Sequence, residues 1–284
     1  MHKLSLWGHV WRHLFIWAAL AFTFFPIVWV VSASFDGTNT LVQQSVVPIA
    51  PTLDNYRMLA QEPRYPFFTW MWNSIKVSGA NAFISVFLCA LAAYAFSRFR
   101  FRGRRAGLFA LILVQVFPQV LAVVSIYLLL LSIGRYVPGL GLNTHAGLVM
   151  VYLGGAIGIN TWLMKGYFDT IPKELEESAF IDGASRFTTF TRIVLPLVRP
   201  ILVVVFILTF IGTYSDYILA RVLLQSNEQL TLAVGMNLFI GDQYARRWGV
   251  FSAGALIASI PIVTIFMLLQ KQLISGLTQG GVKG

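Results

Sequence analysis

Residues 177–196 combine a carboxylate, small side chains, a glycine and a proline at ordered spacing. The set is Glu177, Ser178, Ala179, Gly183, Ile193, Leu195 and Pro196, with nine residues between the glycine and the isoleucine. A carboxylate forms charged contacts, a small side chain allows close packing, and glycine allows a sharp turn. The chemistry that this set indicates is recognition of a partner.

The local sequence predicts a helical hairpin around this set. Pro172 suits the first position of a helix, and the glutamates that follow favour the positive end of the helix dipole. The helix should run to about Asp182 and end at Gly183. Ser185 should then cap a second short helix that runs through Arg192, and Pro196 should break that helix.

The hairpin should expose Ala179, Phe180 and Phe187 unless a partner covers them. The alternative is an amphipathic helix that lies on the lipid surface. Interfacial helices favour Lys and Arg on their polar face, whereas the first helix of this hairpin is rich in Glu. The composition therefore favours docking to a partner protein.

The composition of the chain places this loop in a membrane protein. Hydrophobic residues make up 57% of the sequence and charged residues 11%, against about 25% in a soluble domain. Six apolar stretches are long enough to cross a bilayer as helices. We therefore predict one all-α, polytopic membrane domain over residues 1–284, with spans at about 14–34, 75–96, 107–131, 146–164, 198–220 and 249–269.

The distribution of basic residues predicts the orientation. If the loops alternate between two sides, one side holds most of the 21 Lys and Arg residues, including the run from Arg98 to Arg105. Such an excess marks the cytoplasmic side. Both termini and the 165–198 loop should therefore be cytoplasmic, whereas loops 35–73 and 221–248 face outward. The net charge of +10 reflects this asymmetry, and we expect no nucleic acid partner.

Several residues in and near the spans have both a structural and a functional interpretation. Pro118 should kink the third span and Pro261 the sixth. Gly154 and Gly158 should allow another helix to approach. Lys76 and Asp216 lie near the ends of spans, where snorkelling to the membrane surface would accommodate their charge. Gln115 and Gln119 suit either interhelical hydrogen bonds or contact with a polar cargo. Trp70 and Trp72 suit an interfacial aromatic belt, and Cys89 suits packing.

The ordered set in the cytoplasmic loop resembles the signature of permease subunits in ABC-type importers. Ser178 stands where the family has a second alanine, which is a small-for-small change. The resemblance covers nearly the whole chain and is nearest to the smaller membrane subunit of maltose/maltodextrin importers. It extends to segments 72–76, 94–101, 141–145, 165–168, 230–236, 276–278 and 280–284.

The resemblance implies a set of partners for this chain. These are a second homologous permease subunit, two copies of an ATPase subunit and an extracytoplasmic sugar-binding protein. The chain itself would lie in the cytoplasmic (inner) membrane, in contact with membrane lipid. Glu177 would form the charged contact with the ATPase, Ala179 the close packing and Gly183 the turn. The C-terminal tail Gly281, Val282, Lys283 and Gly284 would also contact the ATPase. The outer loop would contact the binding protein through Phe239, Gly241, Asp242, Gln243, Tyr244 and Trp248.

The chain is not expected to be an enzyme or to bind a cofactor. No Gly-rich loop ends in Lys-Ser or Lys-Thr, so ATP and Mg²⁺ should be bound by the partner ATPase. The four histidines lack the spacing of metal ligands. Two alternatives stay open: the same machinery importing trehalose or another sugar, and a membrane-embedded enzyme that acts on lipid-linked substrates. The second would need clustered acidic or histidine residues near one interface, which the sequence lacks.

Overall fold

The computed structural model describes residues 6–40, 45–48, 50–241 and 247–280. The described residues form helices joined by short loops, and their one β-bridge is the isolated pair Asp36 and Pro51. This agrees with the all-α prediction. The long helices are α1 (Leu6–Ser34), α3 (Phe67–Arg98), α4 (Arg104–Val116), α5 (Gln119–Tyr136), α6 (His145–Phe168), α10 (Arg199–Tyr214) and α13 (Trp248–Gly280).

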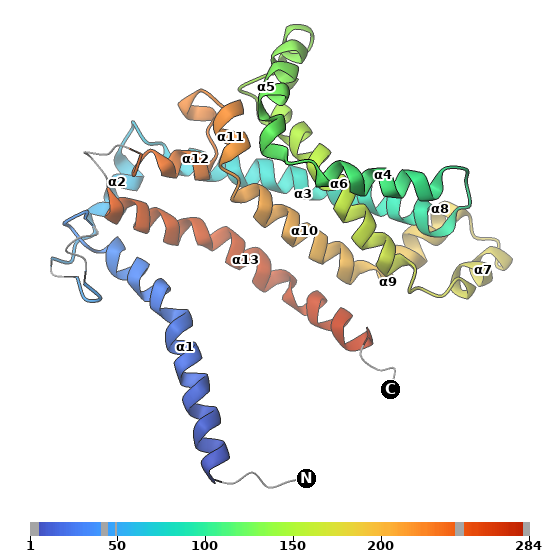
Figure 1. Cartoon of the computed structure of the whole chain (residues 1–284), viewed down its shortest axis with the longest axis horizontal. Helices are drawn as coiled ribbons and strands as arrows, with labels where there is room; N and C mark the ends of the chain where they lie inside the picture. The colour runs from blue at the N-terminus through green and yellow to red at the C-terminus, as the bar shows by residue number, and fades with distance from the viewer. Residues whose placement is uncertain (1–5, 41–44, 49, 242–246, 281–284) are drawn as a thin grey trace. The chain divides into compact units, whose positions relative to one another are not determined.

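Shorter elements connect the long helices. They are α2 (Asp54–Gln61), η1 (Pro138–Leu140), α7 (Glu174–Ile181), α8 (Arg186–Thr189), the π-helical turn η2 (Phe190–Val194), α9 (Leu195–Leu197), α11 (Ile218–Leu223), η3 (Asn227–Gln229) and α12 (Leu232–Asn237). Figure 1 shows these elements coloured by residue number, and the chain divides into two compact units. The first comprises Met1–Phe68 and Gly235–Ile260, and the second comprises Thr69–Val234 and Pro261–Gly284.

Four helices within the described residues are long and apolar enough to cross a membrane, namely α1, α3, α6 and α13. Two bent helix pairs also qualify if each counts as one span, which brings the total to as many as 6. The predicted spans fall within these helices and pairs, except that the fifth runs on to residue 220. Helix α3 begins at Phe67, well before the predicted start at about residue 75. The predicted start is late because polar Asn73 and Ser74 interrupt the apolar pattern from which the span was predicted.

A proline-associated break divides the third predicted span, as expected. Helix α4 ends at Val116, and α5 starts after Pro118 at an angle of 102° (Figure 1). Proline lacks an N–H and disfavours helical geometry in the residue before it, so Phe117 is extended. Helix α13, by contrast, continues as one α-helix through Pro261.

The first unit is fastened by hydrogen bonds around α2. The buried Asn55 amide donates to the carbonyl oxygens of Ser34 (3.0 Å) and Asp36 (2.9 Å). The Tyr56 hydroxyl donates to Ser34 Oγ at 2.8 Å, and the Gly249 N–H donates to Asn39 Oδ1 at 3.1 Å. These bonds tie the end of α1 and the start of α13 to the loop that carries α2.

The expected aromatic belt does not include Trp70. Its side chain is fully buried, and its indole N–H donates to the Asn227 carbonyl oxygen at 2.8 Å. Asn73 donates to the carbonyl oxygens of Glu228 (2.7 Å) and Leu230 (3.0 Å). Trp70 therefore anchors the η3 segment onto α3, and the belt prediction fails for this residue. Trp72 is 59% exposed, as an interfacial residue would be.

The core of the second unit lies where α3, α6 and α10 meet the hairpin. Its buried members come from α3, α6, η2 and α10 with the residue before it: Cys89, Ala90, Ala93, Tyr94, Met164, Phe168, Phe190, Val194, Val198, Ile201 and Val205. Cys89 is fully buried, in agreement with its predicted packing role. This core places the hairpin against the ends of the long helices.

Candidate functional site

The predicted hairpin is present as α7, a turn at Gly183, and α8. Gly183 has φ +83°, a left-handed conformation that glycine adopts without strain. The Ala184 N–H donates to the Ala179 carbonyl oxygen at 2.9 Å, and the Gly183 N–H donates to that of Phe180 at 3.1 Å. These two bonds form a Schellman motif, which ends α7. The helix begins at Glu174, so Pro172 precedes it and does not occupy its first position.

Helix α7 has two faces. Glu176 and Ala179 lie three residues apart on the face that packs inside the chain, and they are 5% and 7% exposed. Glu177 and Ser178 are exposed, as is Ile181 at 87%. The expectation that Ala179 would be exposed is therefore wrong, because a helix that packs on its neighbours needs a small residue on its inner face.

The second arm of the hairpin begins at Ser185 as predicted. Its Oγ accepts the Thr188 N–H at 3.1 Å, which caps α8. Phe187 points outward and is 74% exposed. The Arg186 guanidinium lies 5.3 Å from the ring centre of Phe99 and 5.9 Å from that of Phe180. With Ile181, Phe187 gives the tip of the hairpin an exposed apolar surface.

The last three residues of the ordered set lie where the hairpin meets α10. Ile193 and Leu195 are half-buried, and Leu195 packs against the core of the second unit. Pro196 is exposed near the start of α9. The segment from Arg186 to Leu197 bends by 73° into α10. The break therefore lies two residues after Pro196, at Val198, whose backbone is not helical.

A buried ion pair joins α7 to the end of α3. The Arg98 Nε donates to Glu176 Oε1, and the two side chains are only 7% and 6% exposed. The Tyr94 hydroxyl donates to Glu176 Oε2 at 2.9 Å. Arg98 also donates to the Ile171 carbonyl oxygen at 3.0 Å. Both carboxylate oxygens therefore have a partner from one face of α3.

Sequence reasoning missed this cluster. The sequence placed Tyr94 in a segment that resembles the importer family, Arg98 in that segment and in the basic run, and Glu176 in an acidic first turn. The pair is separated by 78 residues, so no local pattern joins its members. The available signal was a Tyr and an Arg spaced i, i+4 at the end of an apolar helix.

A second, more exposed charged contact lies beside the first. Lys165 pairs with Asp169, and the Ser97 hydroxyl donates to Asp169 Oδ1 at 2.7 Å. Burial alone would raise the pKa of Asp169, but these two hydrogen bonds and the charges of Lys165 and Arg104 lower it overall. The carboxylate is therefore ionised at neutral pH and holds the end of α6 to α3.

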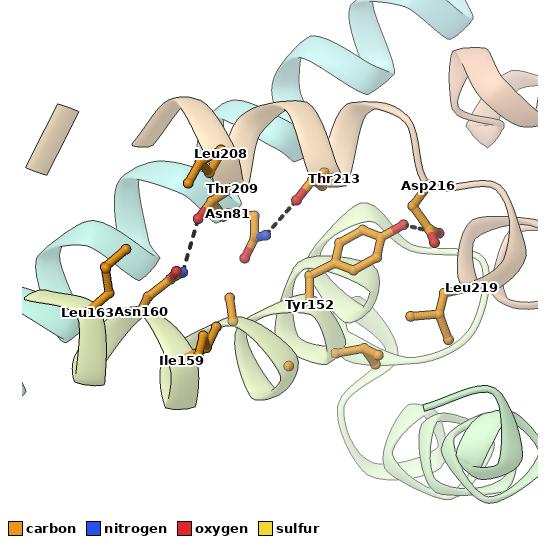
Figure 2. A pocket seen from close by; sticks show the side chains of 14 residues that line it. Asn81, Tyr152, Ile159, Asn160, Leu163, Leu208, Thr209, Thr213, Asp216 and Leu219 are labelled. Atoms are coloured by element: carbon orange, nitrogen blue, oxygen red, sulfur yellow. Dashed lines mark hydrogen bonds between the residues drawn. The ribbon is translucent and has the colours of Figure 1, made fainter. Parts of the chain in front are cut away.

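A cavity of about 430 Å³ lies between α3, α6 and α10 in the second unit. Figure 2 shows polar side chains that meet across it. Asn81 donates to Thr213 Oγ1 at 2.7 Å, and Asn160 donates to Thr209 Oγ1 at 3.1 Å. Glycine, alanine and larger apolar residues complete the wall, among them Gly155, Ala156 and Leu208.

The charged residue at this cavity is Asp216, just beyond α10. It accepts a hydrogen bond from the Tyr152 hydroxyl at 2.7 Å and from the Ala220 N–H at 3.1 Å (Figure 2). These bonds fix the half-buried carboxylate at the edge of the cavity, and its snorkelling stays a prediction. Lys76 is exposed, as snorkelling requires.

Helix α4 packs closely on α6, in agreement with one of the two glycine predictions. A Cβ at Gly158 would lie 2.5 Å from the Leu111 carbonyl oxygen, whereas one at Gly154 would meet nothing within 4 Å. Gln115 donates to the Gly155 carbonyl oxygen at 2.7 Å, which is an interhelical hydrogen bond. Gln115 therefore has the structural role that was one of its two interpretations.

The predicted binding-protein loop is described at its two ends. Phe239 is 1% exposed, with its ring centre 5.0 Å from that of Tyr65, so its side chain packs within the chain. Gly241 is exposed, and half-buried Trp248 begins α13. Asp242, Gln243 and Tyr244 lie outside the described residues, as does the tail Gly281, Val282, Lys283 and Gly284.

Comparison with known proteins shows the class to which this helical protein belongs. Residues 85–279 match the family model described as binding-protein-dependent transport system inner membrane component. The chain belongs to this family. It is a multi-pass protein of the inner membrane and a transport component rather than an enzyme, and the predicted resemblance to ABC importer permeases is confirmed.

Individual relatives extend the match to almost the full chain. The maltose/maltodextrin transport system permease protein MalG of Vibrio parahaemolyticus is 42% identical over 292 aligned residues, with 99% of this chain and 98% of the relative covered. MalG of Escherichia coli K12 is 40% identical, with 96% and 95% covered. The galactooligosaccharides transport system permease protein GanQ of Bacillus subtilis is 40% identical, with 96% of each chain covered.

Solved structures agree on the fold. One chain from a bacterial ABC transporter involved in the import of alginate has a TM-score of 0.79 at 22% identity, with 95% of this chain and 99% of that chain covered. A second, from an alginate transporter in complex with a substrate-bound periplasmic protein, has a TM-score of 0.66 at 18% identity. Because the relatives are transport permeases, the alternative of a membrane-embedded enzyme that acts on lipid-linked substrates is not supported.

Proposed function

We propose that this chain is one of two permease subunits in an ATP-driven importer of maltodextrin-type oligosaccharides. Its partners would be a second homologous permease, two copies of an ATPase subunit and an extracytoplasmic sugar-binding protein. Relatives named as maltose/maltodextrin permeases cover 99% of the chain at 42% identity. A galactooligosaccharide permease at 40% identity supports the oligosaccharide class but leaves the particular sugar to be measured.

The proposed membrane arrangement has six spans with both termini in the cytoplasm. It counts α4 with α5 as one span and places the fifth span in α10, so that α8 stays with the hairpin outside the membrane. The hairpin then lies on the cytoplasmic side, together with the Arg-rich segment between α3 and α4. The segment that contains Phe239 and Trp248 lies on the opposite side, where a binding protein would dock.

The observation that carries the proposal is the exposed apolar tip of the hairpin. Ile181 and Phe187 are 87% and 74% exposed in a segment that lies between membrane helices in the sequence. An exposed apolar pair beside the Glu177 carboxylate suits a protein cleft that offers apolar walls and a basic group. We assign that cleft to the ATPase subunit, which would also bind ATP and Mg²⁺. The tail Gly281–Gly284 would add a second contact.

The cavity between α3, α6 and α10 would form this subunit's share of the sugar pathway. Amide, hydroxyl and phenol groups that line a cavity within apolar helices offer hydrogen bonds to sugar hydroxyls. Asn160 and Tyr152 are the side chains best suited to that role, since each carries both a donor and an acceptor. The partner permease would supply the facing wall.

A charge placed on the hairpin tip tests the docking assignment. Phe187→Glu should leave the fold intact, because the side chain is exposed, and should reduce the ATPase subunit that co-purifies with the permease complex by about tenfold or more. Val47→Glu is the matched control, because Val47 is 75% exposed and lies in a predicted outer loop. Equal ATPase recovery in both variants would contradict the proposal.

A further inference from the structure

For the ATPase to move the membrane helices through the hairpin, the hairpin needs a junction with each of those helices. The hairpin is joined covalently to α6 through residues 169–173 and to α10 through η2 and α9. Helix α3 has no such connection, since it lies more than seventy residues earlier in the chain. A displacement of α7 reaches α3 only through side-chain contacts.

We propose that Arg98 and Glu176, together with Tyr94, are positioning residues that lock the hairpin to α3. The inference rests on the proposed function and adds the means by which the hairpin's motion reaches the membrane helices. With this junction in place, α3 moves with α6 and α10 when the ATPase displaces α7. Without it, α3 follows the hairpin only through apolar packing and the more exposed Ser97–Asp169 contact.

The geometry favours a rigid attachment. Glu176 uses one oxygen for Arg98 and the other for Tyr94, two residues on the same face of α3. The Tyr94 ring also packs against Phe190 from η2, with ring centres 4.7 Å apart. A directional contact of this kind fixes the register of two helices, whereas an apolar contact permits sliding.

Burial separates this pair from an ordinary surface ion pair. The side chains of Arg98 and Glu176 are 7% and 6% exposed, whereas those of Lys165 and Asp169 are 20% and 42% exposed. Water competes weakly for the hydrogen bonds of a buried ion pair, so a buried pair does not exchange partners as a surface pair does. The neighbouring exposed pair is therefore not an equivalent attachment.

The adjacent residues Glu176 and Glu177 lie on different faces of α7 and so have different roles in this proposal. Successive residues on an α-helix point about 100° apart, so Glu176 faces α3 while Glu177 is exposed. A protein that docks on the outer face of α7 leaves the inner carboxylate untouched. Docking and locking are thus separable by mutation.

The experiment compares three equivalent changes on one helix in the complete transporter, reconstituted in proteoliposomes with its binding protein and maltose. Glu176→Gln removes the charge of the lock, and Glu177→Gln removes that of the docking face. Glu174→Gln removes a second exposed charge, three residues from Glu177 on the outer face, and leaves the lock intact. A double variant, Arg98→Met with Glu176→Leu, replaces the pair by apolar side chains of similar size. The measurements are folded yield, ATPase subunit retained, and maltose transported per ATP hydrolysed.

We expect Glu176→Gln to retain the ATPase subunit and to reduce maltose transported per ATP by roughly tenfold. The double variant should regain folded yield but keep the low transport ratio, because it lacks the directional contact. Glu174→Gln should keep the wild-type amount of maltose transported per ATP hydrolysed, because it leaves the lock intact. A wild-type ratio in Glu176→Gln or in the double variant would overturn the inference, as would loss of the ATPase from folded Glu176→Gln. The Glu177→Gln and Phe187→Glu variants test the docking role separately. If both retain the full amount of ATPase subunit, that result contradicts the proposed function and not the inference about Glu176.

Discussion

The hairpin junction and the cavity of the second unit use buried polar side chains in different ways. At the junction, Arg98 and Glu176 form an ion pair with almost no access to water. At the cavity, amide and hydroxyl pairs such as Asn160 with Thr209 line open space. The first arrangement suits a fixed mechanical joint, and the second suits a surface that exchanges hydrogen bonds with a passing solute. Four substitutions test this contrast.

Breaking the junction should have the largest effect on stability. Arg98→Met leaves the Glu176 carboxylate buried without its charged partner, which should lower the free energy of unfolding by about 3–5 kcal/mol. Arg57→Ala, in the exposed pair with Asp54, should change it by less than about 1 kcal/mol. Unfolding of both variants in detergent, monitored by circular dichroism, gives the comparison. Equal losses would show that the junction is not a special contact.

The charged end of the cavity should come second. Asp216→Ala removes the acceptor of the Tyr152 hydroxyl and should lower the free energy of unfolding by about 1.5–3 kcal/mol, the range for a hydrogen bond to a charged group. Asp216→Asn keeps an acceptor and should lose less. The same unfolding measurement applies. A larger loss for Asn than for Ala would contradict the assigned hydrogen bond.

Filling the cavity should affect transport more than stability. A side chain at Gly212 would enter open space, since a Cβ there meets nothing within 4 Å. Gly212→Trp should therefore reduce maltose uptake by about tenfold, or about 1.4 kcal/mol in barrier, with ATPase association unchanged. Gly154→Trp is the control, because it fills a neighbouring and more apolar cavity of about 670 Å³, which shares Val151, Gly155 and Leu219 with the first. Equal uptake in the two variants would remove the pathway assignment.

The smallest effect should come from Asp169 beside the junction. Because its pKa is lowered in the folded protein, its contribution is present above the ordinary carboxyl pKa and is lost as pH falls through the lower folded value. Asp169→Asn should cost less than about 1 kcal/mol at pH 7, since the carboxylate is 42% exposed. At pH below the lowered folded pKa of Asp169, the stabilities of the variant and the wild type should converge. A difference that grows in acid would contradict the lowered pKa.

Local features of the hairpin could be predicted from sequence because each depends on a few neighbouring residues. The left-handed turn at Gly183 and the cap at Ser185 follow from residue type alone. The break at Pro118 follows from its missing N–H.

Long-range pairs escaped prediction because their partners are far apart in the chain. The Asp216–Tyr152 contact and the burial of Trp70 against Asn227 depend on how helices pack. The inward face of Ala179 likewise depends on which side of α7 meets α3, which composition does not specify. Hydropathy located the apolar spans, but the start of α3 at Phe67 depends on contacts with the 227–230 segment.

Site-specific photocrosslinking at the hairpin tip tests the central claim most directly. The single cysteine, buried Cys89, is changed to Ser, and a benzophenone label is attached to Cys placed at Ile181, with Val47 as the matched site. Illumination of the assembled transporter should join the Ile181 label to the ATPase subunit and leave the Val47 label unattached to it. A transporter in which the Ile181 label reacts only with lipid, or with the binding protein, would contradict the account.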